Sequence, residues 1–325
     1  MSRPSDMLSL VADVGGTNTR VALADGCVLR PGSVERYRNA EHPSLGAVLS
    51  LYLAEQGHPD CDGACAAIAG PVEDGKGKLT NLDWQIDGTE LAEAAQAETV
   101  AVLNDLQAQG YGVAHTPEEK LRPVLTGDGQ PAPAGAAQIV IGVGTGFNIA
   151  PIYAVGDRHL VTPSEAGHVT LPVKSEEDLS LARFVGQTHG FADVEEVLSG
   201  RGIENIYAWL GASSGGDRAS AAEIFSGFES TRDDRTDETA RIFARILGTV
   251  AGDLALLHLP YGGIYFSGGV TRAFGPHLRE LGFEQAFLDK GRFSSLMRRF
   301  SVHIIEDDFA ALAGCAGFLE ERMRH

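Results

Sequence analysis

Short apolar segments that predict β-strands alternate with segments that predict helices through the first hundred residues of the chain. Residues 7–14 and 20–24 predict the two strands of a hairpin, and a strand of small residues is expected within 61–72. Between them, residues 44–57 carry apolar side chains at the i, i+3, i+4 spacing of a helix that ends at Gly57. This alternation predicts an α/β fold whose sheet is covered on both faces.

A turn of glycine and threonine occurs twice in the same setting. "DVGGTNTRVAL" begins at Asp13 and "GVGTGFNIAPI" begins at Gly142, and each has an apolar strand, the turn, an Asn and a second apolar strand. The consecutive Gly15 and Gly16 allow backbone N–H groups to turn toward a phosphate oxygen. The repeat is what two similar domains would show if each contributed a phosphate-binding hairpin to a shared cleft. A plain hairpin turn and a chance match are the alternatives.

The rest of the chain keeps the same alternation. A proline- and glycine-rich stretch at 126–138 precedes another strong strand, residues 176–260 predict mostly helix, and 262–270 predict a strand that ends in paired glycines. Near the end, Asp307 and Asp308 are expected to cap a helix that carries a stripe of small residues, which would suit close packing. The stripe is formed by Ala310, Gly314 and Gly317.

Length and charge limit the classes of function. A chain of 325 residues exceeds one typical hydrophobic core and suits two domains. With 44 acidic and 26 basic side chains the net charge is −18, which disfavours nucleic acids and membrane surfaces as partners. An anionic substrate would have to be bound by backbone N–H groups, a metal ion or a few local cations.

Cysteine usage and hydropathy predict a soluble, cytoplasmic protein. The four cysteines form no CxxC pair, so ordinary reduced thiols are expected. The N-terminal apolar run is interrupted by Asp13 and does not have the pattern of a signal peptide. No run approaches the ~18 apolar residues that a membrane-spanning helix needs.

Two motif matches do not have the chemistry or setting that their motifs need. "GPVEDGKG" at 70–77 resembles a P-loop, but Gly77 stands where a hydroxyl must reach Mg²⁺, so a polar turn is expected. "GASSG" at 211–215 has the letters of a nucleophile elbow, but a helical pattern precedes it where the motif requires a strand. Neither G-x-G-x-x-G nor H-E-x-x-H occurs in the sequence.

Carboxylates at strand ends are the first candidates for catalysis. Asp13 ends a buried strand, where a carboxylate is costly without a partner. Asp105 directly follows the strand predicted at 99–103, where α/β proteins place their ligands, and is a candidate base. The alternative for Asp105 is a helix N-cap. Asn104 beside it has the chemistry to hydrogen-bond a polyol.

Two further segments carry candidate residues, and in the first of them one carboxylate and one imidazole could together bind vicinal hydroxyls. Glu165 and His168 are three residues apart between strand-like segments, and a surface turn is the alternative. Glu195 and Glu196 lie where a helix is expected to enter a glycine turn, and a solvated helix face is their alternative.

Nine stretches in order, from residue 8 to about 318, resemble the bacterial glucokinases of the hexokinase-like group, in the sugar kinase–heat-shock cognate–actin superfamily. They cover nearly the whole chain. They are "DVGGTNTRVAL", "LTNLDW", "LNDLQA", "GVGTGFNIA", "EAGHV", "EEVLSGRGIENIY", "FSGGV", "FLDKGRF" and the small-residue helix near the C-terminus. The zinc-binding cysteine cluster of the repressor-type sister family is missing, and its DNA-binding head is not expected, because the first strand is predicted to begin by residue 8.

The resemblance implies an ATP-dependent kinase that phosphorylates glucose at its 6-hydroxyl, with Asp105 as general base and Mg²⁺ held by Asp13 through water. It implies sugar contacts from Asn104, Asp105, Glu165, His168 and Glu195. It also implies nucleotide contacts from Asp13, Gly15, Gly16, Thr17, Asn18, Gly144, Thr145, Gly146, Gly268 and Gly269.

The family further implies a two-domain ribonuclease H-like (actin-like ATPase) fold with a nucleotide/sugar cleft, in a homodimer. The small domain is expected to comprise 1–110 plus 306–325, and the large domain 111–305. Another hexose such as mannose, fructose or glucosamine is an alternative substrate. An actin-like or chaperone-like ATPase without a sugar substrate is an alternative from another class.

The chain departs from the family pattern at two places near the expected site. The family usually has Leu-Gly after the second "GTG", where this chain has Phe147-Asn148. Before "GHV" the family usually has Gly-Glu-Gly, where this chain has Ser164-Glu165-Ala166.

Overall fold

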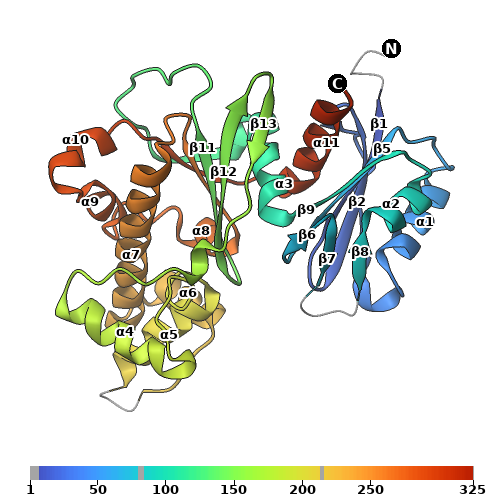
Figure 1. Ribbon diagram of the computed structural model, residues 1–325. Coiled ribbons are helices and arrows are strands. Elements are labelled where there is room, and N and C mark those ends of the chain that lie inside the picture. Colours follow the sequence, from blue (N-terminus) through green and yellow to red (C-terminus); the bar gives the residue numbers. More distant parts are fainter. Residues whose placement is uncertain (1–6, 80–83, 213–215, 325) are drawn as a thin grey trace. The chain divides into compact units, whose positions relative to one another are not determined.

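The structure is a computed structural model that describes residues 7–79, 84–212 and 216–324 (Figure 1). The predicted stretches "LTNLDW" and "GASSG" lie partly outside these ranges. The chain divides into two compact units, described separately below. Unit 1 consists of Met1–Lys120, Gly156–Pro163 and Asp307–His325, and unit 2 consists of Leu121–Val155 and Ser164–Glu306.

A six-stranded sheet forms the centre of unit 1. Its order is β3-β2-β1-β5-β9, and β4 also pairs with β2. β1 runs antiparallel to β2 and parallel to β5, which in turn runs parallel to β9. The predicted hairpin and the strands that follow it are therefore confirmed. The bounds are β1 (Leu8–Val14), β2 (Asn18–Asp25), β3 (Val28–Leu29), β4 (Glu35–Arg38), β5 (Gly63–Ile68) and β9 (Thr99–Asn104).

Helices cover both faces of this sheet, as the sequence predicts (Figure 1). Side chains alternate along β1 with the period of a strand. Leu10 and Val14 pack with helices α1 and α2 on one face, and Val11 packs with α11 on the other. The helices of this unit are α1 (Leu45–Glu55), α2 (Gly88–Ala95), α3 (Asp105–Gly112) and α11 (Ala310–Met323).

Small residues bring α11 and α3 into close contact. A methyl group added at Gly314 would overlap the carbonyl oxygen of Ala108, and one added at Gly112 would overlap that of Ala310. Gly317 packs in the same way against the His115 ring. The predicted role of the small-residue stripe is confirmed. The predicted capping aspartates are wrong, because α11 has Phe309 as its N-cap with no side-chain hydrogen bond.

Unit 2 has a sheet with the same pattern of pairing. The strand order is β10-β15-β14-β11-β12; β11 runs antiparallel to β12 and parallel to β14, and β14 runs parallel to β15. The echo in the sequence therefore corresponds to two hairpins at equivalent places in two similar sheets. The bounds are β10 (Leu121–Leu125), β11 (Gln138–Val143), β12 (Phe147–Val155), β14 (Ile264–Ser267) and β15 (Val302–Ile305).

The helical region predicted from 176 to 260 is confirmed. The core of unit 2 surrounds the 25-residue helix α7, whose N-cap Asp233 accepts hydrogen bonds from the N–H groups of Arg235 and Thr236. Pro260 follows its end, where it cannot continue a helix. The helices are α4 (Glu176–His189), α5 (Gly200–Gly211), α6 (Ala221–Ser230), α7 (Asp234–His258), α8 (Gly269–Phe274), α9 (Phe283–Leu288) and α10 (Ser294–Met297), with η5 (Ala166–His168) and η6 (Gly291–Phe293).

The two motif matches are not functional motifs. "GPVEDGKG" forms the antiparallel pair β6 (Val72–Glu73) and β7 (Lys76–Lys78), joined through Asp74 and Gly75 with positive φ, and β8 (Gln85–Asp87) extends it. This is the polar turn that the sequence predicts. The first residue of "GASSG" ends helix α5, so no strand precedes it.

The predicted domain bounds differ from the compact units at two places. Residues 111–120, with η3 (Val113–His115) and η4 (Glu118–Lys120), stay in unit 1, where α11 packs on α3 and η3. Residues 156–163, with β13 (Arg158–Val161), also belong to unit 1. There the backbone N–H of His159 donates to Glu321 at 2.9 Å, and Gln107 donates to the Val161 carbonyl at 3.0 Å. The division into functional domains stays a prediction.

None of the helices within the described ranges has the length and apolar character needed to span a bilayer.

The α3–α11 contact predicts opposite effects for two Gly→Ala substitutions. Gly314→Ala forces a methyl group against the Ala108 carbonyl and should lower the free energy of unfolding by about 1–3 kcal/mol. The control is Gly186→Ala in α4, where the nearest atom to the new methyl is 3.6 Å away. The control should gain up to about 1 kcal/mol from helix propensity. Denaturant unfolding measures both, and equal effects would contradict the packing argument.

Candidate active site

The first glycine loop is a tight turn held from below by a buried side chain. The N–H of Gly15 donates to the Asn18 carbonyl at 3.0 Å, and Gly16 and Thr17 are exposed at the tip. Asn39, which is 1% exposed, donates from Nδ2 to the Gly15 carbonyl at 2.7 Å. Its N–H also donates to the Thr17 carbonyl at 3.0 Å. Sequence reasoning missed Asn39, because it lies outside the motif and only pairing of β4 with β2 brings it there.

Strand order places two carboxylates at the same end of the unit 1 sheet. Asp13 lies one residue before the end of β1, Asp105 directly follows β9, and β5 lies between these strands in parallel. Burial raises the pKa of Asp13, opposed by Arg20, whose Nη1 is 3.6 Å from Asp13 Oδ2. Burial and the negative charge of Asp13 raise the pKa of Asp105 to about 6, although the Leu106 N–H bond opposes this.

The N-cap alternative for Asp105 is wrong. The N-cap of α3 is Asn104, whose Oδ1 accepts from the Leu106 N–H at 3.0 Å, and Gln107 completes a capping box. The Asn104 side chain also donates from Nδ2 to the Gly70 carbonyl at 3.0 Å. Asn104 is therefore held at both ends, and it fixes the turn that presents Asp105.

The second glycine loop meets two other glycine segments of unit 2. The N–H of Gly144 donates to the Gly146 carbonyl at 2.9 Å, and its own carbonyl accepts from the Gly200 N–H at 2.8 Å. Gly268 has φ of +104°, and a methyl group there would overlap the Val143 carbonyl. The predicted nucleotide segments at 144–146 and 268–269 therefore lie next to each other.

Glu195 is attached to the start of β12. Its Oε2 accepts from the Phe147 N–H at 2.9 Å, and its Oε1 is 3.2 Å from Nη2 of Arg201. Glu196 shares this Arg201 nitrogen, with its Oε1 3.0 Å away, and its Oε2 accepts from Asn205. Both glutamates lie in turns before α5, so the helix predicted there begins only at Gly200. A methyl group at Gly146 would lie 2.5 Å from Glu195 Oε2.

Glu165 precedes the 3₁₀ segment η5 as its N-cap and His168 ends it; both are exposed, whereas Ala166 and Gly167 between them are buried. His168 Nδ1 is 3.1 Å from Asp193 Oδ2, and this hydrogen bond raises the pKa of His168. The imidazole, 59% exposed, is thus oriented by Asp193 while most of its surface stays accessible. Sequence reasoning missed Asp193, whose bridge to Thr170 brings it beside η5.

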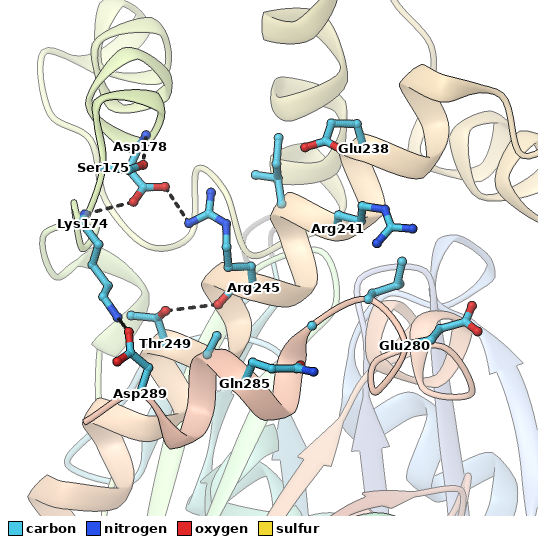
Figure 2. A pocket seen from close by; sticks show the side chains of 14 residues that line it. Lys174, Ser175, Asp178, Glu238, Arg241, Arg245, Thr249, Glu280, Gln285 and Asp289 are labelled. Carbon is cyan, nitrogen blue, oxygen red and sulfur yellow. Dashed lines mark hydrogen bonds and ion pairs between the residues drawn. The ribbon is translucent and has the colours of Figure 1, made fainter. Parts of the chain in front are cut away.

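A pocket of about 690 Å³ between the start of α4, α7 and α9 contains none of the predicted site residues (Figure 2). Most of its charged side chains are already engaged in ion pairs. Lys174 reaches Asp289, and Arg245 lies 2.8 Å from Asp178 (Figure 2). Because these charges are already paired, we place the candidate site at the two glycine loops and at the carboxylates of Asp13 and Asp105 and of Glu165 and Glu195.

The predicted site residues thus form one set in each unit. Unit 1 brings together Asp13, the 15–18 loop, Asn104 and Asp105, and unit 2 brings together the other predicted positions. The cleft expected between the two domains stays a prediction.

The donor set suits a magnesium ion bound largely by substrate and water. Within the described residues, no group of three or more His, Cys, Asp and Glu side chains could hold a metal ion. Mg²⁺ usually binds through one or two carboxylates, with phosphates and waters completing its octahedron. Asp13 fits this role because Arg20, 3.6 Å away, does not fully offset the cost of burying its carboxylate, so its pKa stays raised. A further cation would therefore stabilise its negative charge.

Comparison with known proteins agrees with these features. A family model described as Glucokinase matches residues 10–322. The chain belongs to the glucokinase family. A glucokinase from Nostoc punctiforme is 32% identical over 342 residues, which cover 95% of this chain and 98% of that protein.

Solved structures extend this comparison to the fold. The crystal structure of a glucokinase from an Antarctic psychrotroph has a TM-score of 0.87 at 29% identity, covering 97% of this chain and 99% of that one. A ROK family glucokinase from Streptomyces griseus, in complex with glucose and AMPPNP, is similar in fold alone, with a TM-score of 0.61, 18% identity and coverage of 96% and 98%. The predicted ribonuclease H-like (actin-like ATPase) fold is confirmed.

The raised pKa of Asp105 predicts that its carboxylate destabilises the fold at neutral pH. Between pH 3.8 and about 6 the folded protein retains a proton that the unfolded chain has lost, so stability falls as pH rises. We expect Asp105→Asn to raise the free energy of unfolding at pH 7.5 by up to about 3 kcal/mol. The gain should vanish below about pH 3, where Asp105 is protonated in both the folded and the unfolded chain.

Urea unfolding at the two pH values measures this difference. The control is Asp25→Asn, where the Arg30 hydrogen bond lowers the aspartate pKa, so no gain is expected. A loss of stability in Asp105→Asn at pH 7.5 would contradict the prediction.

Proposed function

We propose that this glucokinase-family protein transfers the γ-phosphoryl group of ATP to the 6-hydroxyl of glucose, with Asp105 as general base. The observation that carries the proposal is a carboxylate whose pKa is raised to about 6, fixed by Asn104 at the end of β9 beside Asp13. A base is most effective when its pKa lies near the operating pH.

The reaction requires one proton transfer and one phosphoryl transfer. Asp105 accepts the proton of the 6-hydroxyl, the sugar oxygen bonds to the γ-phosphorus, and the bond to ADP breaks. Positioning and charge stabilisation supply most of the catalysis in phosphoryl transfer. General base catalysis contributes typically 10²–10⁴-fold.

The sugar is bound by Asn104, Glu165, His168 and Glu195. Carboxylates accept hydrogen bonds from hydroxyl groups, and the imidazole of His168, oriented by Asp193, offers its other ring nitrogen. Glu195 is pre-positioned by Phe147 and Arg201, which supports a role in fixing the ring.

The triphosphate is bound by the backbone of the two hairpins, at 15–18 and 144–146, and the adenosine by Gly268 and Gly269. In a chain with net charge −18, neutral N–H donors offer phosphate binding without a cluster of cations. Asp13 would hold Mg²⁺ through water, and the ion would neutralise charge on the phosphate oxygens. The protein is proposed to act in glycolysis in the cytoplasm, as a homodimer.

A coupled assay of ATP turnover against glucose, mannose, fructose and glucosamine, with a blank lacking sugar, tests the proposal. We expect turnover with glucose at the highest kcat/KM and little in the blank. Equal turnover without sugar would instead support an actin-like or chaperone-like ATPase. Preference for another hexose would replace glucose as the substrate.

Asp105→Ala should reduce kcat by at least about 10²–10⁴-fold, because the base is removed, while glucose still binds. Calorimetric titration with glucose measures the binding. For the wild type, kcat/KM should fall tenfold per pH unit below about 6, as Asp105 becomes protonated. The control is Asp25→Ala, which lies at the end of β2 opposite the 15–18 loop and should remain active. An active Asp105→Ala variant would remove this residue from the mechanism.

Glu165→Gln should raise the KM for glucose by about 10–100-fold, because hydrogen bonds to a charged group are worth about 1.5–3 kcal/mol. The KM for ATP should stay within about twofold. Glu176→Gln, another exposed glutamate of unit 2, is the matched control. An unchanged glucose KM would count against sugar binding by Glu165.

A further inference from the structure

The side chain of Asn148 joins β12 to the segment that carries Glu165. Its Nδ2 donates to the Ser164 carbonyl, and its Oδ1 accepts from the Ala166 N–H at 3.0 Å and from the Ile149 N–H at 2.8 Å. Ser164 and Ala166 are the two neighbours of Glu165. One amide therefore binds the residues on both sides of a predicted sugar ligand.

The segment that receives these bonds belongs to no regular helix or strand at Glu165 itself. Glu165 has φ of −124° and ψ of 46°, neither helical nor extended, so neighbouring strands do not fix its backbone. The Ser164 hydroxyl gives partial support, since it also accepts from the Ala166 N–H at 2.9 Å. Asn148 is the contact that ties this segment to the sheet through both flanking residues.

The residue before Asn148 serves the other sugar carboxylate of unit 2. The Phe147 N–H donates to Glu195 Oε2, and a methyl group at Gly167 would overlap the Phe147 carbonyl. Two consecutive residues, directly after the glycine loop at 144–146, thus contact the segments of both Glu165 and Glu195. These are the two positions where the chain departs from Leu-Gly.

We infer that Asn148 is a positioning residue of the sugar site, which acts by holding Glu165 in its binding conformation. The inference rests on the proposed function. A glycine at 148 has no side chain for this contact, so the chain's own asparagine supplies it. The same asparagine links the sugar-binding segment to the hairpin proposed to bind phosphate.

Asn148→Ala should raise the KM for glucose by about tenfold, the effect of losing about one net hydrogen bond of positioning. The KM for ATP and kcat at saturating glucose should stay within about twofold. Asn148→Asp should raise the glucose KM further, because its carboxylate keeps the acceptor for Ala166 but turns an oxygen toward the Ser164 carbonyl. Tyr153→Phe is the control on the same strand, where the hydrogen bond that is lost, to His258, involves neither neighbour of Glu165.

A double-mutant cycle with Glu165→Gln separates positioning from general structure. If Asn148 acts through Glu165, the double variant should have about the same glucose KM as Glu165→Gln alone. If the two substitutions multiply their effects on the glucose KM in the double variant, the inference is overturned. Equal rises in the KM for glucose and for ATP would also overturn it. Thermal unfolding of each variant identifies any loss due to misfolding. Asn148→Ser, whose shorter side chain offers one hydroxyl in place of the amide, should have a glucose KM between those of wild type and Asn148→Ala.

The outcomes distinguish the two proposals. A wild type that phosphorylates no hexose contradicts the proposed function. An active wild type whose glucose KM rises in Glu165→Gln but not in Asn148→Ala leaves the function intact and overturns the role of Asn148. If Glu165→Gln has no effect on glucose KM, the role of Asn148 through Glu165 also fails.

Discussion

The parallel pairing of β5 with both β1 and β9 is the constraint on which the candidate site of unit 1 depends. Parallel strands end at the same edge of a sheet, so this register brings Asp13 and Asp105 close enough for the charge of one to raise the pKa of the other. β5 consists of small residues up to Ile68, and all six are buried, which lets helices pack closely on both faces. The pKa of Asp105 therefore depends first on its burial and then on the strand order that places Asp13 nearby.

Unit 2 has the same pattern of strand pairing, but its acidic residues are held in place in a different way. In unit 1, backbone register and the capping box of α3 place the functional carboxylate. In unit 2, Glu195 lies in a turn and Glu165 directly before a 3₁₀ segment, and side chains hold these regions in place. Residues at strand ends are fixed by the sheet, whereas residues in turns need a dedicated hydrogen bond.

Local patterns made the strands, helices and most candidate residues predictable from the sequence. Asp105 and Asn104 follow a buried strand directly, so their place at the sheet edge follows from one segment. The partners that hold the site were not predictable, because they come from distant segments. Asn39 lies 24 residues from Gly15, and Asp193 lies 25 residues from His168. The compact units differ from the predicted domain bounds for the same reason, since His159 and Glu321 are 162 residues apart.

The buried Asn39 has a consequence for the first glycine loop as a transferable unit. The peptide "VADVGGTNTRVAL" contains every residue of the turn but not the amide that binds the Gly15 and Thr17 backbone from beneath. A graft of these letters into another hairpin would carry the composition of the loop without its shape. The smallest segment that contains both the loop and its supporting amide runs from β1 through β4 to Asn39. The transferable unit is therefore this four-stranded segment and not the short motif.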